Sequence, residues 1–93
     1  MEIPVNNYNP QKDIDELTEK LINDLNRRGG NYGAVECHHA SFPLVIEPIL
    51  KSFKEKGWFT YYYERFDGAI LDIQIYKSHY SPRNGGMNRL IEY

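Results

Sequence analysis

The stretch Glu36-Cys37-His38-His39 holds the residues of this sequence best suited to chemistry. On an extended strand Cys37 and His39 would lie on one face, and this spacing can bring two metal ligands together. A closed zinc site needs two further ligands, and His79 is the only remaining histidine. Because the sequence has no Cys-x-x-Cys or His-x-x-x-His pair, we expect a small buried cysteine beside surface histidines, without a metal.

The same stretch could instead supply a thiol nucleophile and a histidine base. Neighbouring residues of a strand point to opposite sides, which separates His38 from Cys37. A reactive thiol also needs a lowered pKa, and no helix N-terminus is predicted directly at Cys37 to lower it. We therefore expect a protein that is not an enzyme, with no catalytic residues and no cofactor.

Length and composition indicate one domain. The chain has 93 residues, with 11 Lys and Arg against 13 Asp and Glu, so it lacks the strong positive charge that grips nucleic acid nonspecifically. Cys37 is the single cysteine, which excludes an internal disulfide and favours a reducing, cytoplasmic compartment. We expect a single domain over residues 1–93, with residues 1–8 and 78–93 as flexible arms.

No membrane association is expected. The first residues lack the basic and apolar regions of a signal peptide. No apolar stretch approaches the roughly 18–20 residues that span a bilayer.

Two helices are predicted. Asn9 suits an N-cap and Pro10 the first helical position, and Gly29-Gly30 would end a helix over residues 10–28. Its single apolar stripe consists of Ile14, Leu17, Leu21, Ile22 and Leu25.

The second helix ends at Gly57, and its start is open. It begins near Pro48, or it begins near Pro43 and kinks at Pro48. In both cases Ile49, Leu50 and Phe53 would face inward.

Three strands are predicted, over residues 33–39, 58–66 and 69–77. Asp67-Gly68 between the last two is a strong signal for a two-residue hairpin, because a type I′ turn needs positive φ at both positions. The last strand is the most apolar and is placed centrally, antiparallel to the other two. The fold class is α+β and two-layered, in the order helix-strand-helix-strand-strand, with two helices on one face of a three-stranded mixed or antiparallel sheet.

The aromatic strand WFTYYYERF, residues 58–66, raises the question of which rings are buried. We expect Phe59, Tyr61 and Tyr63 to lie under the helices, and Trp58 and Tyr62 to face outward. The reverse stays open, because Trp58 follows the helix-ending glycine and can tuck beneath the helix. The outward surface would be completed by Ile70 and Tyr76, and the tail would add Tyr80 and Arg83.

Such an uncovered aromatic surface is typical of an interaction site. The predicted binding residues are Trp58, Tyr62, Ile70, Tyr76, Tyr80 and Arg83. The expected partner is another protein or a second copy of the chain, with a homodimer favoured. Residues 87–93 could form a fourth strand, a docking arm or a frayed end, and could also fold back over this surface.

Binding of a nucleotide or of single-stranded nucleic acid is the weaker alternative. Tyrosines would stack on bases, and Arg83 or Arg89 would meet phosphate. Residues 77–93 carry three basic side chains and one acidic side chain, a net charge of +2, which is a small electrostatic footprint.

The order of elements resembles small α/β proteins encoded by bacteriophages, whose roles are diverse or unknown. The resemblance covers residues 10–77. It is carried by Pro48, Lys56-Gly57-Trp58, Tyr61, Tyr63, Asp67-Gly68 and Leu71-Asp72-Ile73-Gln74-Ile75. What the resemblance implies is a viral accessory or structural protein, located in the host cytoplasm or in the virion.

Overall fold

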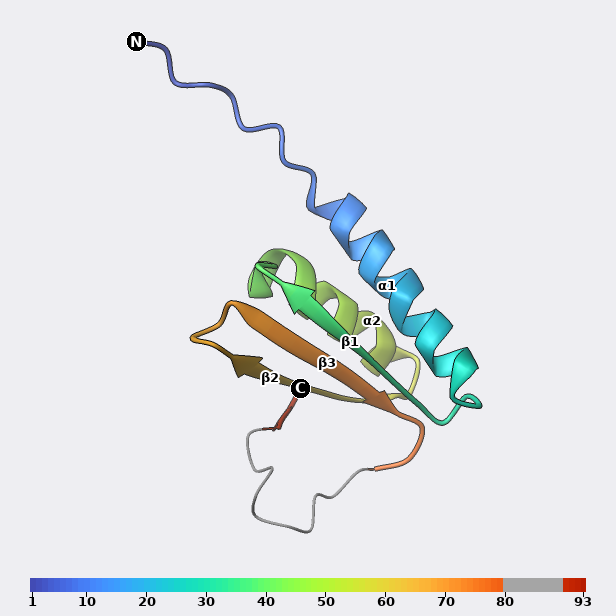
Figure 1. Cartoon of the computed structure of the whole chain (residues 1–93). Coiled ribbons are helices and arrows are strands. Elements are labelled where there is room, and N and C mark those ends of the chain that lie inside the picture. The colour runs from blue at the N-terminus through green and yellow to red at the C-terminus, as the bar shows by residue number, and fades with distance from the viewer. Residues whose placement is uncertain (80–89) are drawn as a thin grey trace.

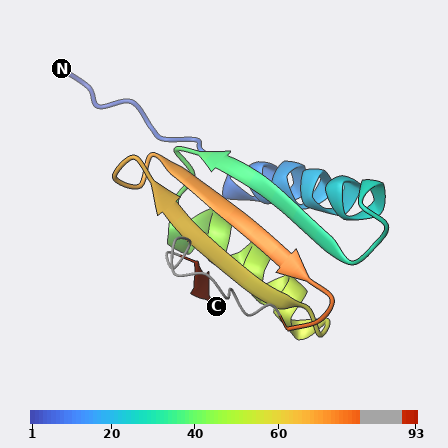
Figure 2. The same cartoon turned by 60° about the horizontal axis from the view of Figure 1, so that its bottom comes forward.

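The structure, a computed structural model, describes residues 1–79 and 90–93. Both helices lie on one face of an antiparallel sheet whose strand order is β1-β3-β2-β4 (Figures 1 and 2). This confirms the α+β class, the order of the elements and the central place of β3, while the described sheet has four strands instead of three. The elements are α1 (Pro10–Arg27), β1 (Tyr32–His38), η1 (Phe42–Ile46), α2 (Glu47–Glu55), β2 (Phe59–Arg65), β3 (Ile70–Tyr76) and β4 (Ile91–Glu92).

Helix α1 begins and ends close to the predicted positions. The Asn9 side chain accepts a hydrogen bond from the Gln11 N–H at 3.1 Å, and Pro10 occupies the first turn. At the other end, the Gly30 N–H donates to the Leu25 carbonyl at 2.8 Å, which satisfies one of the last free carbonyls of the helix. One member of the predicted apolar stripe, Ile22, is exposed instead of facing the core.

Each of the two predicted starts has a counterpart in the structure: the π-helical turn η1 begins at Phe42, beside Pro43, and the α-helix α2 begins at Glu47, beside Pro48. The Ser41 hydroxyl accepts the Leu44 N–H at 3.3 Å and caps η1, a π-helical turn. The Glu47 N–H then donates to the Phe42 carbonyl, five residues back. A wide turn of this kind loosens the backbone directly before Pro48, whose ring would clash inside a regular helix.

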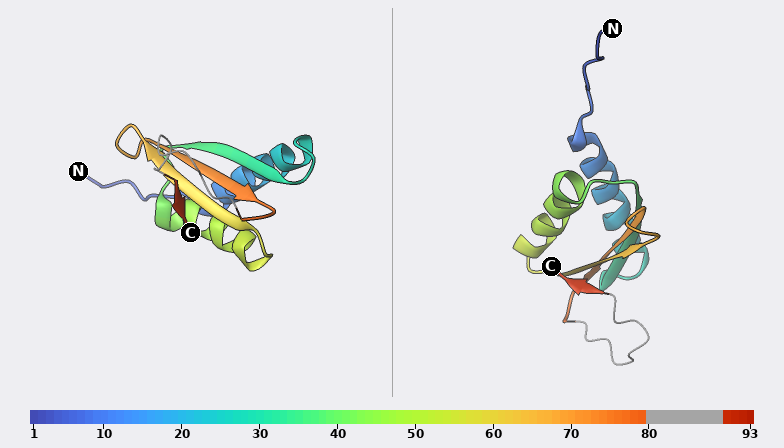
Figure 3. Two further views of the ribbon diagram at one scale, coloured as in Figure 1. Left: turned by 90° about the horizontal axis from the view of Figure 1, so that it is seen from below. Right: turned by 90° about the vertical axis from the view of Figure 1, so that its left-hand side faces the viewer.

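The two helices lie on the same side of the sheet (Figure 3), and the hydrophobic core fills the space between the two layers. Helix α1 packs very close to β1 at Gly33, where a Cβ would stand 3.1 Å from the Leu21 carbonyl oxygen and 3.2 Å from Leu25. Glycine suits this approach, because a Cβ at these distances would force the helix to move aside. The buried core consists of Leu21, Leu25, Cys37, Val45, Ile46, Ile49, Leu50, Leu71, Ile73 and Ile75.

The β2–β3 hairpin has the predicted turn. Asp67 and Gly68 both have positive φ, 54° and 87°, and the Ala69 N–H donates to the Phe66 carbonyl at 3.0 Å. Phe66 also has positive φ, 54°, so β2 ends at Arg65, one residue earlier than predicted.

The two ends of the described chain behave differently. Residues 1–8 run away from the body in every view (Figures 1 and 3). At the other end β4 pairs with β2, and the Tyr93 N–H donates to the Thr60 carbonyl at 2.9 Å. Of the three roles predicted for residues 87–93, the fourth strand is therefore present over Ile91–Glu92, while residues 87–89 lie outside the described part. Among the described residues, no helix combines the length and the apolar character needed to cross a membrane.

Candidate interaction surface

The two faces of β2 are the reverse of the predicted arrangement. Tyr62 pairs with Ile73 of the core and packs on Phe42, with ring centroids 4.8 Å apart. Trp58 also packs against the core, so the prediction that Trp58 and Tyr62 face outward is wrong. The physical reason lies at the end of α2, where the Trp58 N–H donates to the Phe53 carbonyl at 3.1 Å. This bond holds Trp58 beneath the helix, and strand alternation sets every later residue.

The opposite face of the sheet carries no helix, and we refer to it as the helix-free face. Ile70 and Tyr76 lie on it as predicted, because they alternate with the buried residues of β3. Sequence reasoning placed the β2 aromatics on the wrong face and did not include Tyr32. The helix-free face consists of Tyr32, Ala34, Glu36 and His38 of β1, Ile70, Asp72, Gln74 and Tyr76 of β3, and Phe59, Tyr61, Tyr63 and Arg65 of β2.

One end of the helix-free face is aromatic. Tyr76 of the central strand pairs with Tyr32 on one side and with Phe59 on the other. The rings of Tyr32 and Tyr76 lie 4.7 Å apart, and Tyr61 meets Tyr76 edge-on at 5.6 Å. Phe59, at 37% exposure, is the most open of the aromatic rings on this face, and His79 contacts it edge-on at 5.4 Å. The two edge-on contacts have a geometry that is favourable for aromatic pairs.

The other end of the helix-free face is polar. The Arg65 guanidinium donates to Glu36 at 2.7 Å and to Asp72 at 3.1 Å, so it bridges the carboxylates of β1 and β3. This guanidinium lowers the pKa of Glu36. A side-chain hydrogen bond to Asp72 raises the pKa of Tyr63, which is the next residue in the same cross-strand row. His38 lies 3.3 Å from Glu36, and the charges at this end are therefore largely matched within the molecule.

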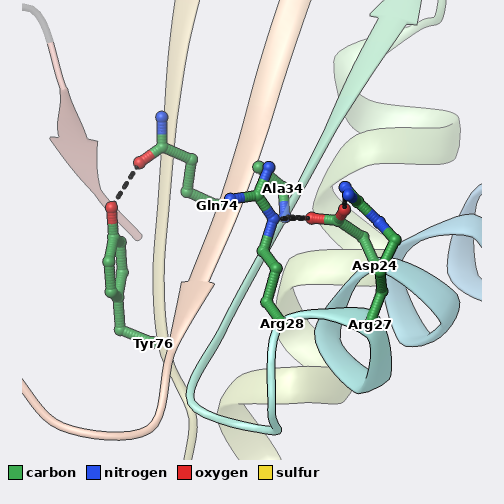
Figure 4. Close-up of polar contacts among 6 residues, drawn as sticks. All are labelled: Asp24, Arg27, Arg28, Ala34, Gln74 and Tyr76. Atoms are coloured by element: carbon green, nitrogen blue, oxygen red, sulfur yellow. Dashed lines mark hydrogen bonds and ion pairs between the residues drawn. The ribbon is translucent and has the colours of Figure 1, made fainter.

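Where α1 meets β1, a small polar network borders the aromatic end (Figure 4). Asp24 accepts the Ala34 N–H at 2.9 Å and the Arg28 Nε at 2.8 Å, and it also pairs with Arg27. Arg28 in turn lies over the Tyr32 ring, 4.9 Å from its centroid. Burial raises the pKa of Asp24, but these bonds outweigh it and hold the pKa below its usual value. On β3, the Tyr76 hydroxyl donates to Gln74 at 2.8 Å.

Cys37 lies in the core, on the other side of the sheet. It is 1% exposed, and burial, with a smaller contribution from the charge of Asp72, raises its pKa to about 12. His38 lies on the opposite face of β1, and both His38 and His39 are exposed. The prediction of a buried cysteine beside surface histidines is confirmed. Over residues 1–79 and 90–93, no group of three His, Cys, Asp or Glu side chains is arranged to hold a metal.

The remaining predicted binding residues, Tyr80 and Arg83, lie outside the described residues, as does Arg89 of the nucleic-acid alternative.

The sequence did contain a signal for the observed orientation of β2, because Trp58 directly follows Gly57, and a helix-ending glycine turns the chain back under its own helix.

No family model, curated protein or solved structure matches the chain.

Proposed function

We propose that this protein is a small, non-enzymatic interaction protein that binds another protein surface, or a second copy of itself, through the helix-free face. The observation that supports this proposal is the row of three rings, Tyr32, Tyr76 and Phe59, on a sheet face that neither helix covers. Tyrosine and other aromatic residues anchor protein interfaces, because they bury a large ring at a small cost in side-chain entropy.

The character of the face favours a protein surface over a small ligand. A shallow hollow lies on it between Ala34, Glu36, Asp72 and Gln74, with a volume of about 190 Å³. Sites for small molecules usually enclose roughly 300–1,000 Å³. A broad face with an aromatic end and an internally neutralised polar end is closer to a protein interface, which combines an apolar centre with a polar rim.

Binding of a nucleotide or of single-stranded nucleic acid ranks second. Rings suitable for stacking are present, and Arg28 lies at the edge of the aromatic end. However, Arg28 is paired with Asp24, and Arg65 with Glu36 and Asp72. A phosphate would have to compete with these carboxylates, which weakens the electrostatic attraction.

The resemblance to small bacteriophage proteins supports a viral accessory or structural role, in the host cytoplasm or in the virion. A catalytic role is not part of the proposal, since a buried thiol whose pKa is about 12 carries almost no thiolate at neutral pH.

The test replaces the two outer rings of the aromatic row. In Tyr32→Thr/Phe59→Thr, β-branched residues keep the strands favourable while the aromatic area is lost. The matched control is Leu44→Thr, which removes an exposed apolar side chain of η1, away from the sheet face. Multi-angle light scattering between about 5 and 200 μM measures self-association, which micromolar affinity would make visible.

If the wild type associates through the helix-free face, the dissociation constant of that contact is expected to rise about tenfold in the double variant, with the control unchanged. If the wild type remains a monomer, self-association through the face is wrong. The partner form of the proposal is then tested by co-purification from the native host. Capture of the same protein by wild type and by the double variant would overturn it.

A further inference from the structure

Residues 1–5 form an extended arm without support from the body. The side chains of Ile3 and Val5 are 91% and 82% exposed, and Met1 is fully exposed. The root of the arm is held, because the Tyr8 hydroxyl donates to Asp13 of α1 at 2.6 Å. The Tyr8 N–H also donates to the Asn6 side chain at 2.9 Å. Three exposed apolar side chains therefore follow one another on an arm whose base is held to α1. Exposed apolar groups of this kind mark an interaction site.

The arm has the pattern of an edge strand. Met1, Ile3 and Val5 alternate with polar residues and with Pro4, so in an extended chain the three apolar side chains share one face. In an extended chain the backbone N–H and C=O groups of successive residues also point to alternate edges of the strand. The edge to which Pro4 contributes lacks an N–H and pairs poorly. The opposite edge, formed by the backbone groups of Ile3 and Val5, has all its N–H groups. The arm can therefore add to a sheet through the Ile3 and Val5 edge.

Strand β1 offers a suitable edge. Its odd-numbered residues bond to β3, and the His39 N–H continues this ladder to the Ala69 carbonyl at 2.9 Å. The even-numbered residues therefore point their backbone groups outward. The Ala34 N–H is taken by Asp24, but the backbone groups of Glu36 and His38 have no hydrogen-bond partner within residues 1–79 and 90–93.

We infer that the arm of one chain adds as an antiparallel edge strand to the Glu36–His38 edge of β1 in a second copy, and that the two copies exchange arms reciprocally. The register that places Val5 opposite Glu36 and Ile3 opposite His38 uses both free positions and avoids the occupied Ala34. Paired residues share a face of the sheet, so the two side chains extend the helix-free face. The occupant is a second copy, because the arm extends away from its own sheet in Figure 1 and in the right-hand view of Figure 3.

The exchange is tested on the full chain with two variants. Ile3→Asp/Val5→Asp makes the arm polar, and His38→Pro removes an outward N–H at a position where an edge strand accepts proline. The matched control is Ile22→Asp, which changes an exposed apolar residue of α1. Circular dichroism verifies that each variant is folded, and sedimentation velocity measures dimerisation.

Wild type and control are expected to dimerise, and each of the two variants to raise the dimer dissociation constant at least about tenfold. Hydrogen exchange should show protection of the Glu36 and His38 amides that is lost in the arm variant. A dimer that tolerates the arm variant overturns the inference, and so does a monomeric wild type, whether its arm exchanges freely or is protected on its own β1.

The ring variant separates the arm exchange from the proposed function, so that either can fail without the other. Tyr32→Thr/Phe59→Thr keeps the arm and the β1 edge, so it should retain the arm-exchanged dimer while it loses binding through the aromatic row. Loss of the dimer in the arm variants alone supports the exchange, and loss in the ring variant alone assigns the dimer to the helix-free face and overturns the exchange.

Discussion

The carboxylate of Asp24, in the last turn of α1, accepts the backbone N–H of Ala34 in β1 at 2.9 Å. The Ala34 N–H points away from the sheet at its edge, and this bond gives it a partner on helix α1. Asp24 also holds Arg28 by a hydrogen bond (Figure 4), and Arg28 lies over the ring of Tyr32, 4.9 Å from its centroid. One carboxylate therefore links the end of α1 to β1 and to the border of the aromatic end.

Asp24→Ala is expected to reduce the free energy of unfolding by about 1–3 kcal/mol, because the Ala34 N–H loses its partner. Urea denaturation followed by circular dichroism measures the change. Asp24→Asn should cost less, since the amide oxygen can still accept this bond. Arg27→Ala is the control for the exposed ion pair and should change little. Equal losses in Asp24→Asn and Asp24→Ala would show that charge, and not the backbone bond, dominates.

The contribution of the Asp24 charge to the stability of the fold depends on pH. The pKa of Asp24 is lower in the folded protein than its usual value, so its charge stabilises the fold fully at pH values above the unfolded pKa of about 4. This contribution is lost as the pH falls through the folded pKa. The stability difference between wild type and Asp24→Asn should therefore shrink in acid and be constant between about pH 6 and 8. A difference that grows in acid would contradict the assignment.

Gly33→Ala is expected to destabilise the fold by about 1–3 kcal/mol. A Cβ at this position would stand 3.1–3.2 Å from backbone atoms of Leu21 and Leu25, and a helix backbone has little freedom to move away. Thermal or urea unfolding measures the effect, with Asn31→Ala on the neighbouring exposed position as the control. A neutral result would mean that α1 can shift on β1, and that their close packing is not required.

Sequence reasoning predicted the elements of this fold more reliably than their sidedness. Caps and glycine stops placed α1 within one residue, and Asp67-Gly68 placed the hairpin, because both signals are local. The choice of face for β2 depends on how the chain leaves α2, through the bond from Trp58 to Phe53. That contact is a property of the folded helix end, and composition alone could not weigh it against the alternative.

The sequence predicted a sheet face that carries aromatic residues and no helix, but it identified only some of the residues on that face. The alternation of β3 correctly placed Ile70 and Tyr76 on the helix-free face. On β2 the faces are reversed, so the helix-free face carries Tyr61 and Tyr63, while Tyr62, which was predicted there, packs on the core. Tyr32 could not be chosen from sequence, since its place beside Tyr76 follows from the pairing of strands that are far apart in the chain.

The reversed faces of β2 give a direct comparison of neighbouring tyrosines. Tyr62→Ala removes a ring packed on Phe42 and the core, and it should cost about 2–4 kcal/mol of unfolding free energy. Tyr63→Ala removes a ring from the helix-free face and should cost roughly 1 kcal/mol or less. Urea denaturation of both variants measures the difference. A larger loss in Tyr63→Ala than in Tyr62→Ala would restore the original assignment of the faces.

Cys37 should be chemically silent in the folded protein. Its thiol is 1% exposed and its pKa is about 12, so both access and thiolate formation are suppressed at pH 8. Reaction with a disulfide reagent such as dithionitrobenzoate should be at least about 100-fold slower in native buffer than in concentrated urea. Since Cys37 is the only cysteine, the unfolded chain should release one equivalent of chromophore and serves as its own control. Native labelling as fast as labelling in urea would show that Cys37 is accessible, and it would reopen a role for the thiol.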